Sequence, residues 1–183
     1  MHNTDRQFEA AIAQCREVFD KKMNDYGSAW RILRTTSLTD QIYIKANRIR
    51  SIEEKAVQKI DEQARDEFIG IVNYSVMALI QLASGGQLRE LAHDEALALY
   101  NQHIYAAKAL MNDKNHDYDE AWRNMRISSY TDIILMKLLR VKQIEDNQGK
   151  TLVSEGLEAN YADIINYALF ALIKIAESES NTG

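Results

Sequence analysis

The sequence predicts an all-α protein: a helical bundle built from two tandem three-helix repeats with pseudo-twofold symmetry. The 183-residue chain contains no proline and only seven glycines, whereas strand-rich folds generally use both residues in many turns. Its long stretches are rich in Ala, Leu, Ile, Glu, Lys and Gln, which are all compatible with helix. The chain also repeats itself, and this internal duplication sets the expected architecture.

The stretch Lys22–Glu53 aligns with Lys114–Glu145, and roughly half of the aligned positions are identical. The second copy then contains one extra residue before the match resumes. We expect one domain, 1–183, with repeat one at about 5–85 and repeat two at about 90–178. The shared positions are mainly polar or aromatic, although a core needs only apolar volume, so they predict retained hydrogen-bond chemistry. They include Lys22/Lys114, Asp25/Asp117, Tyr26/Tyr118, Trp30/Trp122, Thr39/Thr131, Asp40/Asp132, Lys45/Lys137, Arg48/Arg140, Glu53/Glu145, Asn73/Asn166 and Tyr74/Tyr167.

Each repeat is expected to form three helices. Ser37 and Ser129 each precede an aspartate by three residues, which is the pattern of a capping box at the start of the second helix. The glycines within Ser84–Gln87 predict the turn that ends repeat one. The expected ranges are roughly 5–24, a second helix from Ser37, and 58–83 in repeat one, and roughly 90–114, a second helix from Ser129, and 153–177 in repeat two.

A motif with an aspartate, a tyrosine, a tryptophan and an arginine is expected in the loop after the first helix of each repeat. In the structural interpretation the tryptophan fills the core and Asp25 holds the loop. In the functional interpretation Tyr26 or Trp30 lies against a flat base, while Lys22 or Arg31 lies near its phosphates. The substrate-binding residues predicted from both copies are Lys22, Asp25, Tyr26, Trp30, Lys114, Asp117, Tyr118 and Trp122.

The second helix carries a lysine inside its apolar stripe, where an unpaired charge is costly. Lys45 lies between Ile42 and Ile49, and an arginine follows three residues later. The lysine could pair with an acid of another helix, extend its head group to water, or hold a phosphate together with the arginine. Under the phosphate hypothesis the catalytic residues are Lys45, Arg48, Lys137 and Arg140, which would stabilise phosphoryl oxygens.

The third helix is nearly all apolar, yet it carries an asparagine and several acids on one face. A buried amide must be hydrogen-bonded, and clustered carboxylates need a divalent cation or a lysine partner. Mg²⁺ prefers oxygen ligands and commonly bridges to substrate phosphates. Asp163 aligns with Gly70 and Glu67 with Asn160, so the two sites are not equivalent: one is degenerate, or each supplies part of a composite site. The candidate substrate-binding residues are Asn73, Asn166 and Tyr167, and the candidate metal ligands are Glu62, Asp66, Glu67, Glu155, Glu158 and Asp163.

The pattern K-x-x-D-Y, K-x-x-R and D-x-x-N-Y-A resembles a bacterial and phage family of nucleotide-modification-associated domains. In this chain it reads Lys114–Tyr118, Lys137–Arg140 and Asp163–Ala168, and two copies cover nearly the whole sequence. That family is distantly similar to the all-α MazG-like nucleoside triphosphate pyrophosphohydrolases. The resemblance implies that acidic residues on neighbouring helices hold magnesium and that the bond between the α and β phosphates is cleaved.

Two functions follow as hypotheses. The first is Mg²⁺-dependent pyrophosphohydrolysis of a nucleoside or nucleotide-like triphosphate, with a pteridine triphosphate as a variant. The second is a non-catalytic nucleotide-binding or scaffold protein whose polar cluster is a buried salt-bridge network. A net charge of −5 argues against a nucleic-acid-binding role.

The remaining expectations concern the setting of the protein. Cys15 is the only cysteine, which excludes an internal disulfide and a cysteine-based zinc cluster. The sequence shows no signal-like segment and no apolar run long enough to span a bilayer, so we expect a cytoplasmic protein without membrane contact. The wide apolar faces of a three-helix unit also make a homodimer a reasonable expectation.

Overall fold

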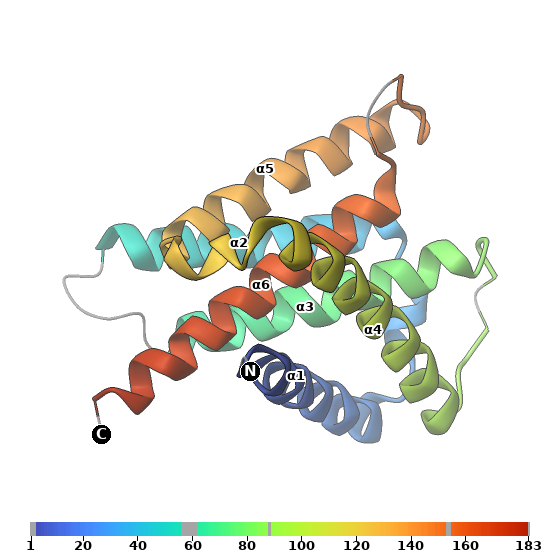
Figure 1. Ribbon diagram of the computed structural model, residues 1–183. Coiled ribbons are helices and arrows are strands. Elements are labelled where there is room, and N and C mark those ends of the chain that lie inside the picture. The colour runs from blue at the N-terminus through green and yellow to red at the C-terminus, as the bar shows by residue number, and fades with distance from the viewer. Residues whose placement is uncertain (1–2, 56–61, 88, 153–154, 183) are drawn as a thin grey trace.

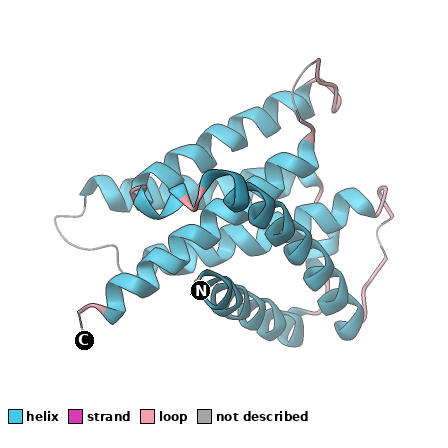
Figure 2. Cartoon of the chain, viewed as in Figure 1, coloured by secondary structure: helices cyan, strands magenta, loops and turns pink. Residues whose placement is uncertain are grey.

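The computed structural model describes residues 3–55, 62–87, 89–152 and 155–182. Within these ranges the chain forms six α-helices and two short 3₁₀ turns and contains no strand (Figure 2). The all-α prediction and the two tandem repeats are therefore confirmed. Repeat one consists of α1 (Thr4–Tyr26), η1 (Ala29–Ile32), α2 (Thr35–Lys55) and α3 (Glu62–Ala83), and repeat two of α4 (His93–Tyr118), η2 (Ala121–Asn124), α5 (Ile127–Asp146) and α6 (Leu157–Ser180).

The helices are arranged as three layers of pairs (Figure 1). Helices α3 and α6 pack against each other in the centre, with α2 and α5 on one side and α1 and α4 on the other. The two central helices have the most apolar sequences, and a helix that is apolar all round is stable only when it is covered on all sides. No helix in the described ranges is long and apolar enough to cross a membrane.

Equivalent hydrogen bonds hold the two repeats in the same internal arrangement. Asn73 Nδ2 donates to the Cys15 carbonyl at 3.0 Å, and Asn166 Nδ2 donates to the Ala107 carbonyl at 2.8 Å. In each repeat, therefore, the asparagine of the third helix fixes the first helix through a backbone carbonyl. A buried amide has to be bonded in this way, which explains an asparagine among apolar neighbours without invoking a ligand.

The predicted capping boxes are wrong. Helix α2 begins at Thr35 and α5 at Ile127, so Ser37 and Ser129 lie inside the first turn instead of at the N-cap. In repeat two the 3₁₀ turn η2 is followed directly by extended residues, and the last of them, Arg126 (φ −75°, ψ 149°), is the N-cap of α5. Helix α5 therefore starts at Ile127, before Ser129.

The other helix ends also differ from expectation. Helix α1 continues to Tyr26 and stops at Gly27, whose φ of 59° favours glycine. The Asp-Tyr part of the motif consequently lies in the last turn of a helix and not in a loop, and α4 repeats this ending. Helix α6 begins at Leu157, later than expected, and the expected residues 58–61 and 153–154 lie outside the described ranges.

Candidate functional site

Repeat one contains a cavity of about 600 Å³ between α1, η1, α2 and α3. The cavity reaches solvent, since Tyr26 at its mouth is 71% exposed and Lys22 is exposed as well. Seven of the predicted residues line it, and they come from α1, η1, α2 and α3. They are Lys22, Tyr26, Trp30, Lys45, Asp66, Glu67 and Asn73.

One wall of the cavity is aromatic and apolar. Trp30 is partly buried and packs at a tilt against Phe19, with ring centroids 6.1 Å apart. Its indole nitrogen lies 3.5 Å from the sulfur of Met23, which also lines the cavity. The tryptophan is therefore held in place by Phe19 and Met23, and it lines the cavity with the part of its ring that remains exposed.

Charged side chains from α2 and α3 also line the cavity, and Arg48 lies beside them. Lys45 Nζ lies 3.3 Å from Glu67 Oε2, and Arg48 lies 3.1 Å from Glu67 Oε1. Glu67 is buried, so these two cations supply the pairing that a buried carboxylate needs. Lys45 also lies 5.7 Å from the ring centroid of Tyr74, which links the charged side chains to the aromatic ones.

Gly70 leaves α3 bare beside Lys45. A Cβ atom at this position would lie 2.7 Å from both Cδ and Cε of Lys45, so the lysine stem occupies the space that a side chain would take. Repeat two has Asp163 at the equivalent position. The copies therefore differ in what fills this space, which is the stem of Lys45 in repeat one and the side chain of Asp163 in repeat two.

Asn73 lines the cavity but both ends of its amide are already used. Besides the bond to Cys15, its Oδ1 accepts a hydrogen bond from the Tyr100 hydroxyl at 2.7 Å. Burial raises the pKa of Tyr100 well above its usual value, so this hydroxyl remains a donor. The geometry therefore gives Asn73 a structural part, tying α1 and α4 to α3.

In repeat two the equivalent polar residues pair with one another. Asp163 accepts a hydrogen bond from Lys114 and another from Lys137, each at 2.8 Å. Burial alone would raise the pKa of Asp163, but the two lysine bonds outweigh it and the pKa is lowered. The same contact raises the pKa of Lys114. Asp163 is thus an ionised carboxylate clamped between two cations, which is one of the alternatives that the sequence left open.

The tryptophan of repeat two is a core residue. Trp122 is 5% exposed and stacks on Phe170, with centroids 4.4 Å apart and planes within 6°. Phe8 meets its ring edge-on at 6.2 Å. Because Phe170 aligns with Met77, a residue that lines the cavity of repeat one, this aromatic stack takes up the equivalent volume in repeat two.

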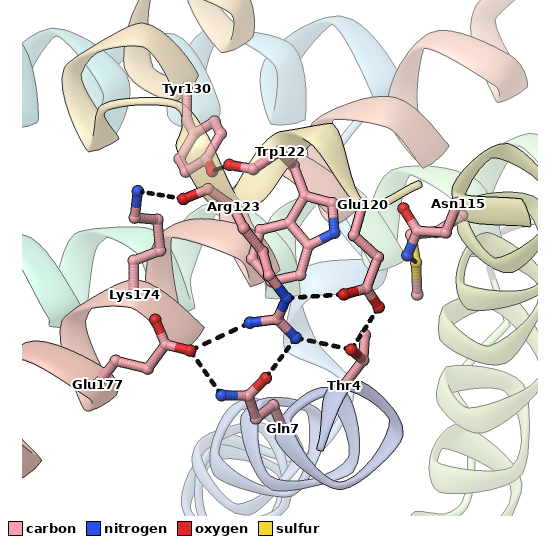
Figure 3. Close-up of polar contacts among 10 residues, drawn as sticks. Thr4, Gln7, Asn115, Glu120, Trp122, Arg123, Tyr130, Lys174 and Glu177 are labelled. Atoms are coloured by element: carbon pink, nitrogen blue, oxygen red, sulfur yellow. Dashed lines mark hydrogen bonds and ion pairs between the residues drawn. The ribbon is translucent and has the colours of Figure 1, made fainter. Parts of the chain in front are cut away.

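The arginine that follows each tryptophan fixes the 3₁₀ turn and does not line the cavity. Arg31 is buried and donates to the Arg89 carbonyl at 3.1 Å, to the Gln87 carbonyl at 2.7 Å and to the side chain of Gln81. Arg123 is held similarly by Glu120, Glu177, Thr4 and Gln7 (Figure 3).

The remaining predicted residues do not gather at one place. Asp25, Asp117, Arg140, Glu155 and Glu158 are exposed, and none of them lines the cavity. Tyr167 is partly buried, with its ring 5.7 Å from Phe170. The side chains of Glu62 and Tyr118 lie outside the described part of the structure. Among the described side chains, no three His, Cys, Asp or Glu residues lie close enough together to hold a metal ion by themselves.

Some cavity residues were absent from the sequence-based set. Tyr74 is the counterpart of the predicted Tyr167, and the repeat alignment could have included it. Gly70 was noticed only as a difference between the copies. Val18, Phe19 and Met77 read as ordinary core positions, and no sequence signal separates a residue beside a cavity from one inside a packed core.

Comparison with known proteins agrees with the duplication. No curated protein and no solved structure matches the chain. The family model described as nucleotide modification associated domain 1 matches twice, over residues 22–82 and 114–175, and these two stretches cover more than half of the sequence. Both matches begin at the lysine of the Asp-Tyr motif and run into the third helix of a repeat. The chain therefore belongs to the nucleotide modification associated domain 1 family and carries two tandem copies of its domain.

Proposed function

We propose that repeat one binds a nucleoside triphosphate, or a nucleotide-like triphosphate such as that of a pteridine, and cleaves it between the α and β phosphates with the help of Mg²⁺. The observation that carries this proposal is a cavity of about 600 Å³ that is lined by both aromatic and charged side chains. A volume of this order is typical of small-molecule sites. The family description, which refers to nucleotide modification, supports a ligand of this class.

The aromatic wall is suited to a flat heterocyclic base. Trp30, Tyr26 and Tyr74 all line the cavity, and their rings offer stacking surface together with N–H or O–H groups that can orient a ring. The phosphates would then meet Lys22 of α1 and Lys45 of α2, with Arg48 three residues after Lys45 on α2. Lysine and arginine are the side chains that most often bind phosphate.

The carboxylates of the cavity suit magnesium that arrives together with a triphosphate. Glu67 and Asp66 both line the cavity, and they are neighbours on α3. Mg²⁺ is commonly held by one or two carboxylates plus substrate phosphates, so a dedicated cluster of three acids is not required. When bound, the ion would neutralise phosphate charge and lower the pKa of a bound water.

A non-catalytic nucleotide-binding protein is the second candidate, and the pairing of Glu67 favours it. Both carboxylate oxygens of Glu67 are engaged, one by Lys45 and one by Arg48. Glu67 can hold a metal only if a bound triphosphate draws Lys45 and Arg48 away from its carboxylate. If it does not, the site binds and does not turn over.

The two candidates are separated by measuring pyrophosphate release from a panel of nucleoside and pteridine triphosphates, with and without Mg²⁺. Hydrolysis is supported by release that depends on Mg²⁺ and on the identity of the base. A rise in melting temperature with a nucleotide and Mg²⁺, without release, supports the binding protein. The absence of both effects for every triphosphate would overturn the whole proposal.

A further inference from the structure

The two repeats place the same pair of lysines in opposite situations. Lys114 and Lys137 converge on the carboxylate of Asp163, each at 2.8 Å. Their counterparts in repeat one are Lys22 and Lys45, and both line the cavity together with Gly70, which stands where repeat two has Asp163. Repeat one thus keeps the two cations but has a glycine where repeat two has the carboxylate that both lysines share, and its Lys45 pairs with Glu67 instead.

We infer that a phosphoryl group of the ligand binds between Lys22 and Lys45, over Gly70, at the place that the Asp163 carboxylate holds in repeat two. By the same reasoning, the Asp163 carboxylate occupies the anion position of repeat two, so no ligand binds there. The inference deepens the proposed function, on which it rests for the identity of the complete ligand, and it assigns one ligand to each chain.

The charges of repeat one leave this position open. Lys22 pairs with no described carboxylate, whereas its counterpart Lys114 is bound to Asp163. Lys45 does have an acidic partner, but Glu67 reaches it from about one helical turn away from Gly70. That contact, at 3.3 Å, is also longer than either lysine contact of Asp163, and Glu67 shares its charge with Arg48.

The space over Gly70 is covered by flexible atoms only. The atoms nearest to an added Cβ are Cδ, Cε and Nζ of Lys45, at 2.7, 2.7 and 3.1 Å. In repeat two the side chain of Asp163 fits beside Lys137, which is the counterpart of Lys45. A lysine at this position of the repeat can therefore share the space with an acidic side chain. An anion that draws the Lys45 ammonium group toward itself needs no movement of the backbone.

In repeat two, side chains of the protein occupy both parts of the equivalent site. Asp163 fills the anion position, and the Trp122–Phe170 stack fills the aromatic position. Neither part is occupied in this way in repeat one, because Gly70 and Met77 replace Asp163 and Phe170. These two differences between the copies therefore coincide with the two occupied parts of the site in repeat two.

The first test titrates the full chain with tripolyphosphate, an anion without a base, and follows binding by calorimetry. Gly70→Asp supplies repeat one with its own carboxylate, and we expect affinity to fall at least about tenfold, the effect of losing one charge-assisted contact. Gly70→Asn is the matched control, since it has the same shape without the charge. Its amide takes the same place, so it should also weaken binding, but clearly less than Gly70→Asp, and the difference between the two variants measures the effect of the charge. Circular dichroism verifies that both variants are folded. Equal affinity of Gly70→Asp and the wild type would overturn the inference.

The second test compares the equivalent lysines. Lys22→Met should weaken tripolyphosphate binding at least about tenfold, whereas Lys114→Met should leave affinity and stoichiometry unchanged because that lysine only serves Asp163. Asp163→Gly should add a second binding equivalent by freeing Lys114 and Lys137. A loss of binding in Lys114→Met but not in Lys22→Met would place the anion in repeat two and overturn the inference.

These outcomes are independent of catalysis. If the Gly70 and Lys22 variants behave as expected while no triphosphate is hydrolysed, the anion site stands and the proposed hydrolysis fails. If triphosphates are hydrolysed but Gly70→Asp binds tripolyphosphate normally, the proposed function stands and the anion site is wrong.

Discussion

Thr39 of α2 donates a hydrogen bond to Glu145 of α5 at 3.3 Å. The residues related to them by the internal duplication make the same contact from α5 to α2, since Thr131 of α5 donates to Glu53 of α2 at 3.0 Å. All four are identical or matched positions of the repeat alignment. Their conservation between the copies therefore reflects the seam between the repeats and not a ligand site.

Ion pairs across the same seam follow the same symmetry. Asp40 lies 3.6 Å from Lys142, and its counterpart Asp132 lies 3.9 Å from Arg50. An interface in which residue i meets j and j′ meets i′ is what a symmetric dimer forms. The single chain thus reproduces, between its own halves, the contact pattern of a twofold interface.

The half-buried carboxyls of Glu53 and Glu145 in the seam predict a pH-dependent stability. Burial raises the pKa of both Glu53 and Glu145 above 4.5, against the smaller opposing effect of the threonine bonds. A carboxyl whose pKa is higher in the folded than in the unfolded state stabilises the fold when the pH lies below its unfolded-state pKa. This contribution is lost as the pH rises through the folded-state pKa. Glu145→Gln, which mimics the neutral form, should therefore become progressively more stable than the wild type as the pH rises.

Urea unfolding between about pH 4 and pH 8 measures this difference. The charged groups around Glu145 are Asp40, Asp146 and Lys142, and they remain in both proteins. Glu17→Gln, at an exposed position of α1, is the control and should show no such trend. A difference that stays constant or shrinks with rising pH would contradict the prediction.

Arg31→Met should destabilise the protein strongly. The substitution leaves the Gln81 side chain and the carbonyls of Gln87 and Arg89 without their donor, at a cost of about 2–4 kcal/mol for a buried charged network. The measurement is the free energy of unfolding in urea. Arg34→Met, an exposed arginine of the same segment, should change it by less than about 0.5 kcal/mol. Similar losses in both variants would mean that the network contributes little.

Replacement by leucine should mainly lower stability at Trp122 and mainly weaken ligand binding at Trp30. Trp122→Leu removes a stacked ring from the core and should cost about 3 kcal/mol or more of unfolding free energy. Trp30→Leu should cost less, because Trp30 is only partly buried, and should instead weaken binding of the nucleotide to repeat one. Unfolding and binding measured on the same preparations test this contrast, and a nucleotide affinity that depends on Trp122 alone would refute it.

Tyr100→Phe tests the anchoring of Asn73. Loss of the 2.7 Å bond leaves the buried Oδ1 of Asn73 unsatisfied, which should cost about 1–3 kcal/mol. The internal duplication already contains a natural comparison, because Phe8 aligns with Tyr100 and Asn166 Oδ1 is buried without a partner in the described chain. Tyr43→Phe, which removes a hydroxyl from a partly buried ring, serves as control in the same unfolding experiment and should have little effect.

Glu67→Gln should lower Mg²⁺-dependent turnover at least about tenfold, as expected for a group that supports a metal site. The isosteric amide still fits the space but no longer attracts the metal. The assay is pyrophosphate release over a range of Mg²⁺ concentrations. Glu17→Gln should have no effect on it, since Glu17 pairs with Lys21 on the surface of α1. Turnover that is unchanged in Glu67→Gln would exclude this carboxylate from metal binding.

The sequence by itself determined the helical class, the two copies and the alignment between them. Helical propensity and repetition are properties of local sequence, so the helices and their apolar runs in α3 and α6 could be recognised without the fold. The alignment also brought out Lys45, Glu67 and Gly70 as positions of interest. These residues do meet at the cavity of repeat one.

Only the tertiary structure decided which polar residues pair with each other and which copy is open. Asn73 and Asn166 turned out to be anchors, and Thr39 and Glu145 to be part of a seam, because a side chain's partner depends on which helices face each other. Whether a cavity exists depends on the volumes that several helices bring to one place. The difference between Gly70 and Asp163 affects the charge of the site only because Lys45, or Lys137, lies beside that position in the folded chain.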